Sequence, residues 1–491
     1  MPMSSSQRTA RFSLLAVGVA CAVHSAAGAA ANPANRGSRT AGPQGNFKLE
    51  VPAHRLDLIL ARPEPTSMTL SILAYEDLEG LVVYGPTSAA MDGKTPVQAF
   101  RAGVPTELVV AGLRPDSSYH YQLQSRTPGT GAFQNSPEYS FHTARPPGAA
   151  FNFTLTADVH LDEHTAPSVY LQSLANIRAD RPDFHLDLGN LFMTDKHATR
   201  AEAAQQYLAQ RYYLGQIGPT VPILLALGTH DGESGKDRIG ADPLATWSNS
   251  MRRRYFPNPV PDLFYSGNGT AQPAREPSQN YYAWEWGDAL FVVLDPFSYT
   301  QPGRGRNDGW AWTLGETQYR WLARTLESSR APYKFVFLHN LLSGDQASRG
   351  GVEIAGFNEW GGKNADGTEG FKQHRPGWEL PVHQLLLRNQ VNAVFRAHDN
   401  FYARQELDGI TYLMVPQPSF AGDDRIRDLE NYGYKVGTFR GNAGHVRVSV
   451  SPEKVLIEYV KSTPARTVAD SSVIRTPTRA PAIRAPAPPA P

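Results

Sequence analysis

The sequence predicts an α/β protein in which a layered α/β domain follows a small all-β domain. Two observations lead to this fold class. Short runs that alternate apolar and polar residues fill positions 47–146, whereas nearly all-apolar strands alternate with helical stretches from about 147 onward. With 491 residues, 41% of them hydrophobic and 19% charged, the chain has room for two domains and the composition of an ordinary globular protein.

Residues 1–31 have the pattern of a signal peptide. Arg8 and Arg11 supply a positive start, an apolar stretch follows, and small residues end the segment. We therefore expect an exported protein, periplasmic or secreted, with lipid attachment at Cys21 as the alternative. Cys21 is the only cysteine, so a chain cleaved after it has no disulfide and binds metals through nitrogen or oxygen alone. Residues 32–46 are predicted to be a flexible linker, and no later run is apolar enough for a transmembrane anchor.

Residues 47–146 are predicted to form a small β-sandwich. Turn residues separate its alternating runs, as in such sandwiches. The stretch 113–121, in which a proline turn leads into a tyrosine-bearing strand, is similar to the corner of fibronectin III-like modules. No cluster of ligand side chains occurs in this domain, so we expect a spacer or packing partner. The runs are SMTLSILAY, LEGLVVYG, TELVVAGL, SYHYQLQSR and EYSFHTA.

Residues 147–462 are predicted to form the layered α/β domain. Strands that are apolar throughout indicate a sheet buried on both faces. A hairpin at 445–462 closes the domain, and the Pro/Ala-rich residues 463–491 are expected to be disordered. The expected strands are FNFTLTAD, FHLDLGN, VPILLALG, ALFVVLD, YKFVFLH and VNAVFRAH, and the expected helices are 166–180, 199–215, 315–329 and 380–389.

Polar residues follow five of these strands, and they are the candidate functional residues. Ligands of open α/β sheets gather outside the carboxyl ends of the strands, so these side chains can converge. Each motif alone has an ordinary explanation: Asp-x-His can be a surface accident, and His339 can be a satisfied core histidine. The ordered set is more specific than any member. The strand ends are Asp158-Val159-His160, Asp187-Leu188-Gly189-Asn190, Gly228-Thr229-His230-Asp231, His339-Asn340 and Ala397-His398-Asp399-Asn400.

This set resembles the motifs of the calcineurin-like metallophosphoesterases, and residues 47–146 resemble the N-terminal domain of purple acid phosphatase-type members. The family's motifs are Asp-x-His, Gly-Asp, Gly-Asn-His-Asp/Glu, a lone His and Gly-His-x-His. The resemblance implies a four-layer metallophosphoesterase sandwich. It also implies two metal ions that hold a hydroxide for attack on a phosphate ester.

Several ligand positions depart from the family pattern. The resemblance assigns Asp158 and His160 to one metal, and His339 and His398 to the other. The carboxylate that both metals share is Asn190 here. The family's asparagine ligand is Thr229, and the second histidine of the last motif is Asn400. The tyrosine of the purple members is Met193, so no ferric-tyrosinate centre is expected.

These substitutions remove negative charge from the site. Two divalent ions about 3.5 Å apart repel by roughly 19 kcal/mol at an effective dielectric of about 20. An amide such as Asn190 cannot bridge two ions as a carboxylate does, and Asp158 is the one anionic ligand left in the matched set. We therefore expect a mononuclear or weakly bound divalent metal (Mn, Fe, Zn or Mg) rather than a tight pair.

The candidate catalytic residues are His230 and Asp231. His230 matches the family histidine that stabilises phosphate or protonates the leaving group, and the adjacent Asp231 is expected to orient its ring. The leading function is therefore an exported phosphoesterase acting on a phosphorylated small molecule or ester.

A second reading is a catalytically impaired pseudoenzyme that binds a phosphate-bearing or carbohydrate ligand. An HD-type phosphohydrolase is disfavoured because its His-Asp pair lies on a helix, whereas VPILLALG reads as a strand. A net charge of +1 and the absence of a basic stripe disfavour nucleic acid as a partner. No feature of the sequence indicates an oligomeric state.

Overall fold

The structure, a computed structural model, describes residues 46–238, 242–269, 277–300, 308–344, 348–426 and 428–475. The predicted signal peptide and nearly all of the predicted linker lie outside the described residues. Across the described part of the chain, none of the helices combines the length and apolar character that crossing a bilayer requires.

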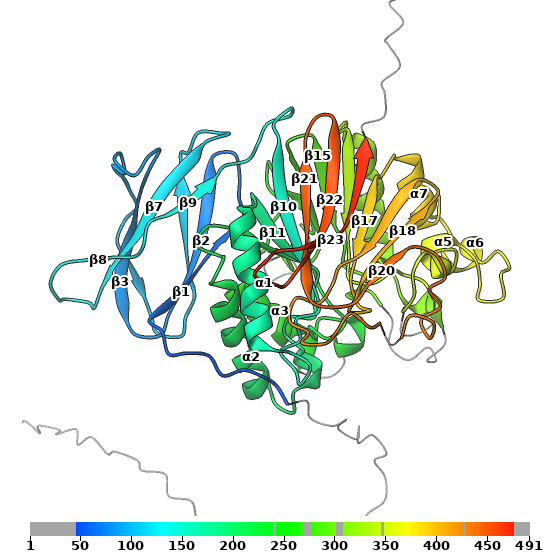
Figure 1. Cartoon of the computed structure of the whole chain (residues 1–491), viewed down its shortest axis with the longest axis horizontal. Helices are drawn as coiled ribbons and strands as arrows, with labels where there is room; N and C mark the ends of the chain where they lie inside the picture. Colours follow the sequence, from blue (N-terminus) through cyan, green and yellow to red (C-terminus); the bar gives the residue numbers. More distant parts are fainter. Residues whose placement is uncertain are drawn as a thin grey trace, which may run out of the picture. The chain divides into compact units, whose positions relative to one another are not determined.

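The first described domain is a β-sandwich of two antiparallel sheets (Figure 1). One sheet has the order β1-β2-β6, and the other has the order β4-β3-β7-β8 with β5 beside β3 and β9 beside β7. Side chains of β7 alternate between buried and partly exposed, as the sequence pattern predicts. The hydroxyl of Tyr119 accepts a hydrogen bond of 2.9 Å from the Arg114 N–H and closes the expected corner. The strands are β1 Leu56–Ala61, β2 Ser67–Ala74, β3 Leu78–Gly85, β4 Gly93–Lys94, β5 Gln98–Phe100, β6 Thr106–Ala111, β7 Ser118–Arg126, β8 Gln134–Asn135 and β9 Tyr139–His142.

The second domain contains two larger sheets. The six-stranded sheet has the order β12-β11-β10-β21-β22-β23, and the eight-stranded sheet has the order β13-β14-β15-β16-β17-β19-β18-β20. Strands β10, β11 and β12 are parallel, as are β15, β16 and β17, so the carboxyl ends within each group share one edge. The strands are β10 Phe151–Thr156, β11 Phe184–Asp187, β12 Ile223–Leu225, β13 Ser266–Gly267, β14 Tyr282–Trp286, β15 Ala289–Val293, β16 Tyr333–Phe337, β17 Ala393–Arg396, β18 Tyr402–Leu407, β19 Ile410–Met414, β20 Thr438–Arg440, β21 Gly444–Val450, β22 Lys454–Lys461 and β23 Val468–Arg475.

Helices cover the outer faces of both sheets and complete the predicted four layers. Aromatic side chains fill the space between the sheets; Phe153 of β10 and Phe291 of β15, for example, have ring centroids 5.1 Å apart. Helices α1 and α2 pack on the smaller sheet, and α4 and α7 pack on the larger one. The α/β fold class with a preceding all-β sandwich is therefore confirmed. The helices are α1 Pro167–Asp180, α2 Arg200–Leu214, α3 Leu244–Tyr255, α4 Gly315–Ser328, α5 Asn358–Gly361, α6 Phe371–His374 and α7 Val382–Arg388.

The expectation of a disordered tail from residue 463 is wrong at its start. Strand β23 pairs antiparallel with β22 and extends the smaller sheet. Its Ala469 and Ile474 pack against the core between the sheets, which gives the strand an apolar inner face. The rest of the predicted tail, 476–491, lies outside the described residues.

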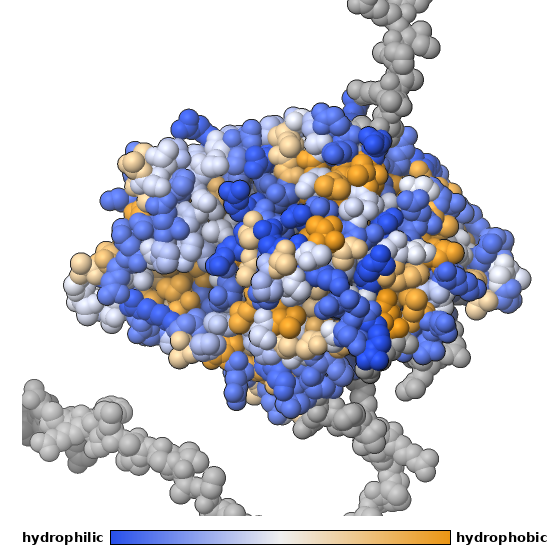
Figure 2. All heavy atoms as spheres, viewed as in Figure 1, coloured by the Kyte–Doolittle hydropathy of each residue, from blue (hydrophilic) through white to orange (hydrophobic). Residues whose placement is uncertain are grey.

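A buried arginine joins the two domains. Arg211 of α2 is fully buried; its guanidinium donates to the Ser71 hydroxyl at 2.9 Å and to the Ser71 carbonyl oxygen at 2.8 Å. Ser71 belongs to β2 of the sandwich, so the sandwich packs directly against the helix layer. On the face shown in Figure 2, hydrophobic residues lie in small groups among hydrophilic ones, as on an ordinary solvent-exposed surface.

Candidate functional site at the strand ends

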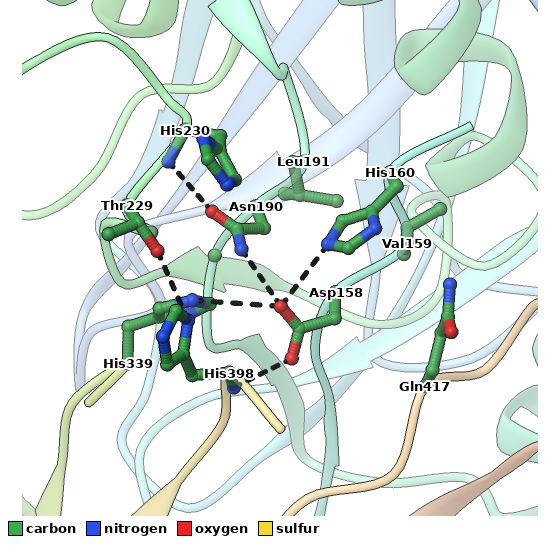
Figure 3. Close-up of polar contacts among 12 residues, drawn as sticks. Asp158, Val159, His160, Asn190, Leu191, Thr229, His230, His339, His398 and Gln417 are labelled. Atoms are coloured by element: carbon green, nitrogen blue, oxygen red, sulfur yellow. Dashed lines mark hydrogen bonds and ion pairs between the residues drawn. The ribbon is translucent and has the colours of Figure 1, made fainter. Parts of the chain in front are cut away.

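The predicted residues meet at the carboxyl ends of β10, β11, β12, β16 and β17 (Figure 3). The turns that follow these strands are strained at non-glycine residues: φ is positive at Asp158 (58°), His160 (56°), Asn190 (60°) and His398 (89°). Such conformations persist only where surrounding contacts hold them, and they concentrate at functional sites. We call the group the strand-end site. Its members are Asp158, His160, Asn190, Thr229, His230, His339, His398 and Asn400.

Asp158 is the centre of the strand-end site. Its carboxylate is fully buried; Oδ1 lies 2.9 Å from Asn190 Nδ2, 3.4 Å from His160 Nε2 and 3.6 Å from His339 Nε2. The other oxygen accepts the backbone N–H of His398 at 2.8 Å. One carboxylate thus connects the ends of β10, β11, β16 and β17.

The hydrogen bonds of Asn190 fix the orientation of its amide. The backbone N–H of His230 donates to Asn190 Oδ1 at 2.9 Å, and a backbone N–H is always a donor. The opposite amide orientation would set donor against donor at His230 and oxygen against oxygen at Asp158. The Asn190 N–H₂ group therefore points at the Asp158 carboxylate.

His160 and His339 flank this carboxylate, and their surroundings shift their pKa values in opposite directions. Burial works to lower the pKa of His160, but Asp158 and Asp162 outweigh it and raise the pKa to about 9. Burial lowers the pKa of His339, whose Nδ1 donates to the Leu188 carbonyl oxygen at 2.7 Å. Burial also opposes the ionisation of Asp158, yet the neighbouring histidines hold its pKa below the usual range. The centre therefore contains an ion pair, His160⁺–Asp158⁻, beside His339, whose positive charge burial disfavours.

Thr229 and Asn400 contact little of this centre. Thr229 Oγ1 lies 3.3 Å from His398 Nδ1. Asn400 has a φ of 65° and a buried Oδ1 that lacks a hydrogen-bond partner among the described residues. Hydrogen bonds and ion pairs thus join the other members of the strand-end site, whereas Asn400 takes part in none of those described.

The carboxylate beside the His230 ring is Asp195, which corrects the expectation for Asp231. His230 Nδ1 lies 3.0 Å from Asp195 Oδ1. The fully buried Asp231 instead accepts the backbone N–H groups of Gly228, Asn190 and Phe192 at 2.7, 3.0 and 2.9 Å. Asp231 therefore holds two strand-end turns in place. The prediction assumed that neighbours in the sequence contact each other, but in the turn after β12 the side chains of His230 and Asp231 point in different directions.

Two known structures resemble this chain over most of its length. The structure of PhoD is 14% identical in sequence and aligns over 89% of this chain and 91% of that chain with a TM-score of 0.62. The purple acid phosphatase PPD1 from yellow lupin (Lupinus luteus) seeds is 15% identical and aligns over 86% of this chain and 74% of that chain with a TM-score of 0.56. This chain has the calcineurin-like metallophosphoesterase fold. No protein-family model and no curated protein sequence matches it.

The strand-end residues do not fit the two-metal centre that the metallophosphoesterase fold implies. Asn190 is the residue that the resemblance places at the bridging carboxylate, and it directs N–H groups, which repel a cation, toward Asp158. The nearby Asp187 is also buried, and burial raises its pKa, which disfavours a negative charge at that position. Among the described residues, no group of three or more His, Cys, Asp or Glu side chains is arranged to hold a metal ion.

Sequence reasoning missed Asp195, which lies in a short 3₁₀ turn at Thr194–Lys196. It is five residues beyond Asn190 and outside any strand-end motif. In the sequence, the one feature that could have pointed to Asp195 is that this carboxylate is followed by Lys196 in a polar loop. The side chain of Lys236 lies 3.6 Å from Asp195 and adds a positive charge beside His230.

Proposed function

We propose that this protein binds phosphate esters at the strand-end site and does not hydrolyse them by the two-metal route. The orientation of Asn190 carries this proposal. Because the His230 N–H occupies Oδ1, the amide can offer only N–H donors toward Asp158. The hydrogen bond from the His230 N–H thus keeps N–H groups, which repel cations, at the position that a bridging carboxylate fills in a two-metal site.

The polar groups that remain suit a phosphate group. His160 is cationic at pH 7, as its pKa of about 9 requires, and its side chain is 12% exposed. The His230 side chain is 25% exposed, with one ring nitrogen held by Asp195. Figure 3 shows both rings on either side of Asn190. A cationic imidazole and a second, partly exposed imidazole favour a phosphate oxyanion.

A phosphoesterase that uses a single divalent ion is the second candidate. The Nε2 atoms of His160 and His339 are buried and lack hydrogen-bond partners among the described residues, and both lie near Asp158 Oδ1. One ion held by these three side chains is the arrangement that could satisfy them. It requires the side chains to move, since they do not converge as placed.

We also propose that the protein is exported. The charged start, apolar stretch and small residues of 1–31 support this location. Fusion of residues 1–31 to a reporter that is active only outside the cytoplasm tests it, with Arg8 and Arg11 replaced by glutamate as the control.

Hydrolysis of p-nitrophenyl phosphate separates the two candidates. We expect the wild type to bind the ester yet to show no turnover with added Mn²⁺ or Zn²⁺. The triple variant Asn190→Asp, Thr229→Asn, Asn400→His, which restores the family's ligands, is expected to gain activity. Metal-dependent turnover by the wild type that disappears in Asp158→Ala would contradict the binding proposal and favour the single-metal enzyme.

A further inference from the structure

A cavity with aromatic walls lies at the start of helix α4, and none of the described residues that line it belongs to the strand-end site. Its volume is about 480 Å³, within the range of roughly 300–1,000 Å³ that is usual for small-molecule sites. The wall comes from the segment after β15, from the start of α4 with the 3₁₀ turn before it, and from the segment after α6. We call it the aromatic pocket. Its principal lining residues are Tyr299, Trp310, Glu316, Gln373, Arg375 and Trp378.

The two tryptophans of the wall are held in fixed orientations. The Trp310 ring stacks on His374, with centroids 4.3 Å apart and planes 6° apart. Trp310 Nε1 also donates to Asn364 Oδ1 at 3.0 Å. The Trp378 ring stacks on Tyr319, with centroids 4.0 Å apart. An apolar wall that is already ordered binds a ligand without the entropic cost of fixing its side chains.

A glycine makes room for the third aromatic ring of the wall. Gly315 has a φ of 73°, and a Cβ at this position would lie 2.7 Å from Cγ of Tyr299. A side chain here would therefore be strained and would displace the tyrosine. Tyr299 thus packs directly on the backbone at the start of α4, and its partly exposed side chain lines the pocket.

The arginine and the glutamate of the wall are already paired. Arg375 donates to the buried carboxylate of Glu359 and to the Trp310 carbonyl oxygen, the latter at 2.8 Å. Glu316 pairs with Arg320, one helical turn along α4, at 2.6 Å. Because each charge has a partner of opposite sign, neither requires a charged ligand.

Two exposed side chains on the wall keep hydrogen-bonding groups for a ligand. Arg320 donates through Nε and Nη2 to the same oxygen of Glu316, Oε1, so Oε2 is left without a partner among the described residues. The Gln373 side chain makes no hydrogen bond within the described part of the chain. A carboxylate oxygen accepts hydrogen bonds, and an amide both donates and accepts. The pocket therefore offers acceptors and donors together.

We propose that the aromatic pocket binds a neutral carbohydrate. A sugar ring presents apolar C–H groups on its faces and hydroxyl groups around its edge. Aromatic side chains match the faces, and an amide and a carboxylate match hydroxyl groups, which donate and accept. The inference does not rest on the function proposed for the strand-end site.

Binding of the fluorescently labelled full chain to an array of neutral, sialylated and sulfated glycans tests the proposal. We expect neutral glycans to be bound. In isothermal titration with the neutral glycan that gives the strongest signal, Glu316→Ala/Gln373→Ala is expected to bind about tenfold more weakly, since hydrogen bonds to the sugar are lost. Both side chains are exposed, so this variant should fold normally.

Gln205→Ala/Glu406→Ala is the matched control, because both of its side chains are exposed and lie outside the aromatic pocket. It should bind the glycan like the wild type. Binding of p-nitrophenyl phosphate should be the same in all three proteins. If the wild type binds the glycan but not this ester, the aromatic pocket stands and the strand-end proposal fails.

Two results would overturn the aromatic pocket. One is a wild type that binds no neutral glycan on the array, whether or not it binds charged ones. The other is equal affinity of the wild type and Glu316→Ala/Gln373→Ala for the neutral glycan, which would place the bound sugar elsewhere.

Discussion

Replacing Asn190 by aspartate should destabilise the protein and make its stability depend on divalent metal. In the wild type the Asn190 N–H₂ group donates to Asp158 Oδ1 at 2.9 Å. In the variant, a second carboxylate faces the first at that distance. Two unit charges at 2.9 Å repel by about 6 kcal/mol at an effective dielectric of about 20.

Proton uptake limits this cost. A carboxyl group with an ordinary pKa near 3.9 can be protonated at pH 7 for about 4 kcal/mol, and at pH 5 for about 1.5 kcal/mol. The pKa of the new carboxyl is raised in the folded state, so the penalty grows as the pH rises above the unfolded value. We expect Asn190→Asp to lose about 4 kcal/mol of unfolding free energy at pH 7 in EDTA and clearly less at pH 5. A divalent ion at about 100 times its Kd would restore about 2.7 kcal/mol.

Urea denaturation with EDTA or Mn²⁺ at the two pH values measures these effects. Asn258→Asp is the matched control, because Asn258 is also buried and its Nδ2 donates to the Leu225 carbonyl oxygen at 2.7 Å. It should be destabilised without rescue by Mn²⁺, since its hydrogen-bond partners among the described residues are Leu225 and Gln279 rather than histidines. If Asn190→Asp were as stable as the wild type in EDTA at pH 7, the assigned orientation of the Asn190 amide would be wrong.

Three further predictions concern the site and the fold. The pKa of His160 is raised to about 9, so the stability that its charged form contributes is complete below pH 6.5 and is lost as the pH rises through 9. Thermal scans from pH 6 to 10 should show a loss of about 3 kcal/mol of unfolding free energy. The variant His160→Gln should not show this loss. Asp231→Asn should lower the unfolding free energy, measured by urea denaturation, by about 2 kcal/mol, because the amide replaces one oxygen that accepts backbone N–H groups with an N–H₂ donor. Unchanged stability together with lost ligand binding would instead make Asp231 a functional residue. Deletion of 463–491 should lower Tm because it removes β23. Deletion of 476–491 leaves β23 in place and should not change Tm. Equal Tm values for the two deletions would show that β23 does not stabilise the fold.

The layered fold and the meeting of the strand-end residues could be predicted from the sequence because each rests on local patterns. Apolar runs such as FNFTLTAD are buried on both faces, and the residue after each run must leave the sheet at its carboxyl edge. Strand β23 was missed because its sequence, VADSSVIR, does not alternate apolar and polar residues and because the Pro-rich composition after it indicated disorder.

The chemistry of the site depends on contacts between residues far apart in the chain. The resemblance implies that Asn190 stands in place of a carboxylate, but the direction of its amide depends on an N–H from His230, 40 residues later. The partner of His230 is likewise set by how the turn of Asp195 folds back on it. Neither contact follows from periodicity or motif spacing.

The metal content of the wild type tests the central claim most directly. The protein would be equilibrated with excess Mn²⁺ or Zn²⁺, desalted and measured by inductively coupled plasma mass spectrometry. Because the Asn190 N–H₂ group is directed at Asp158, we expect at most one equivalent of metal per chain to remain after desalting. Two equivalents retained after desalting would contradict this account.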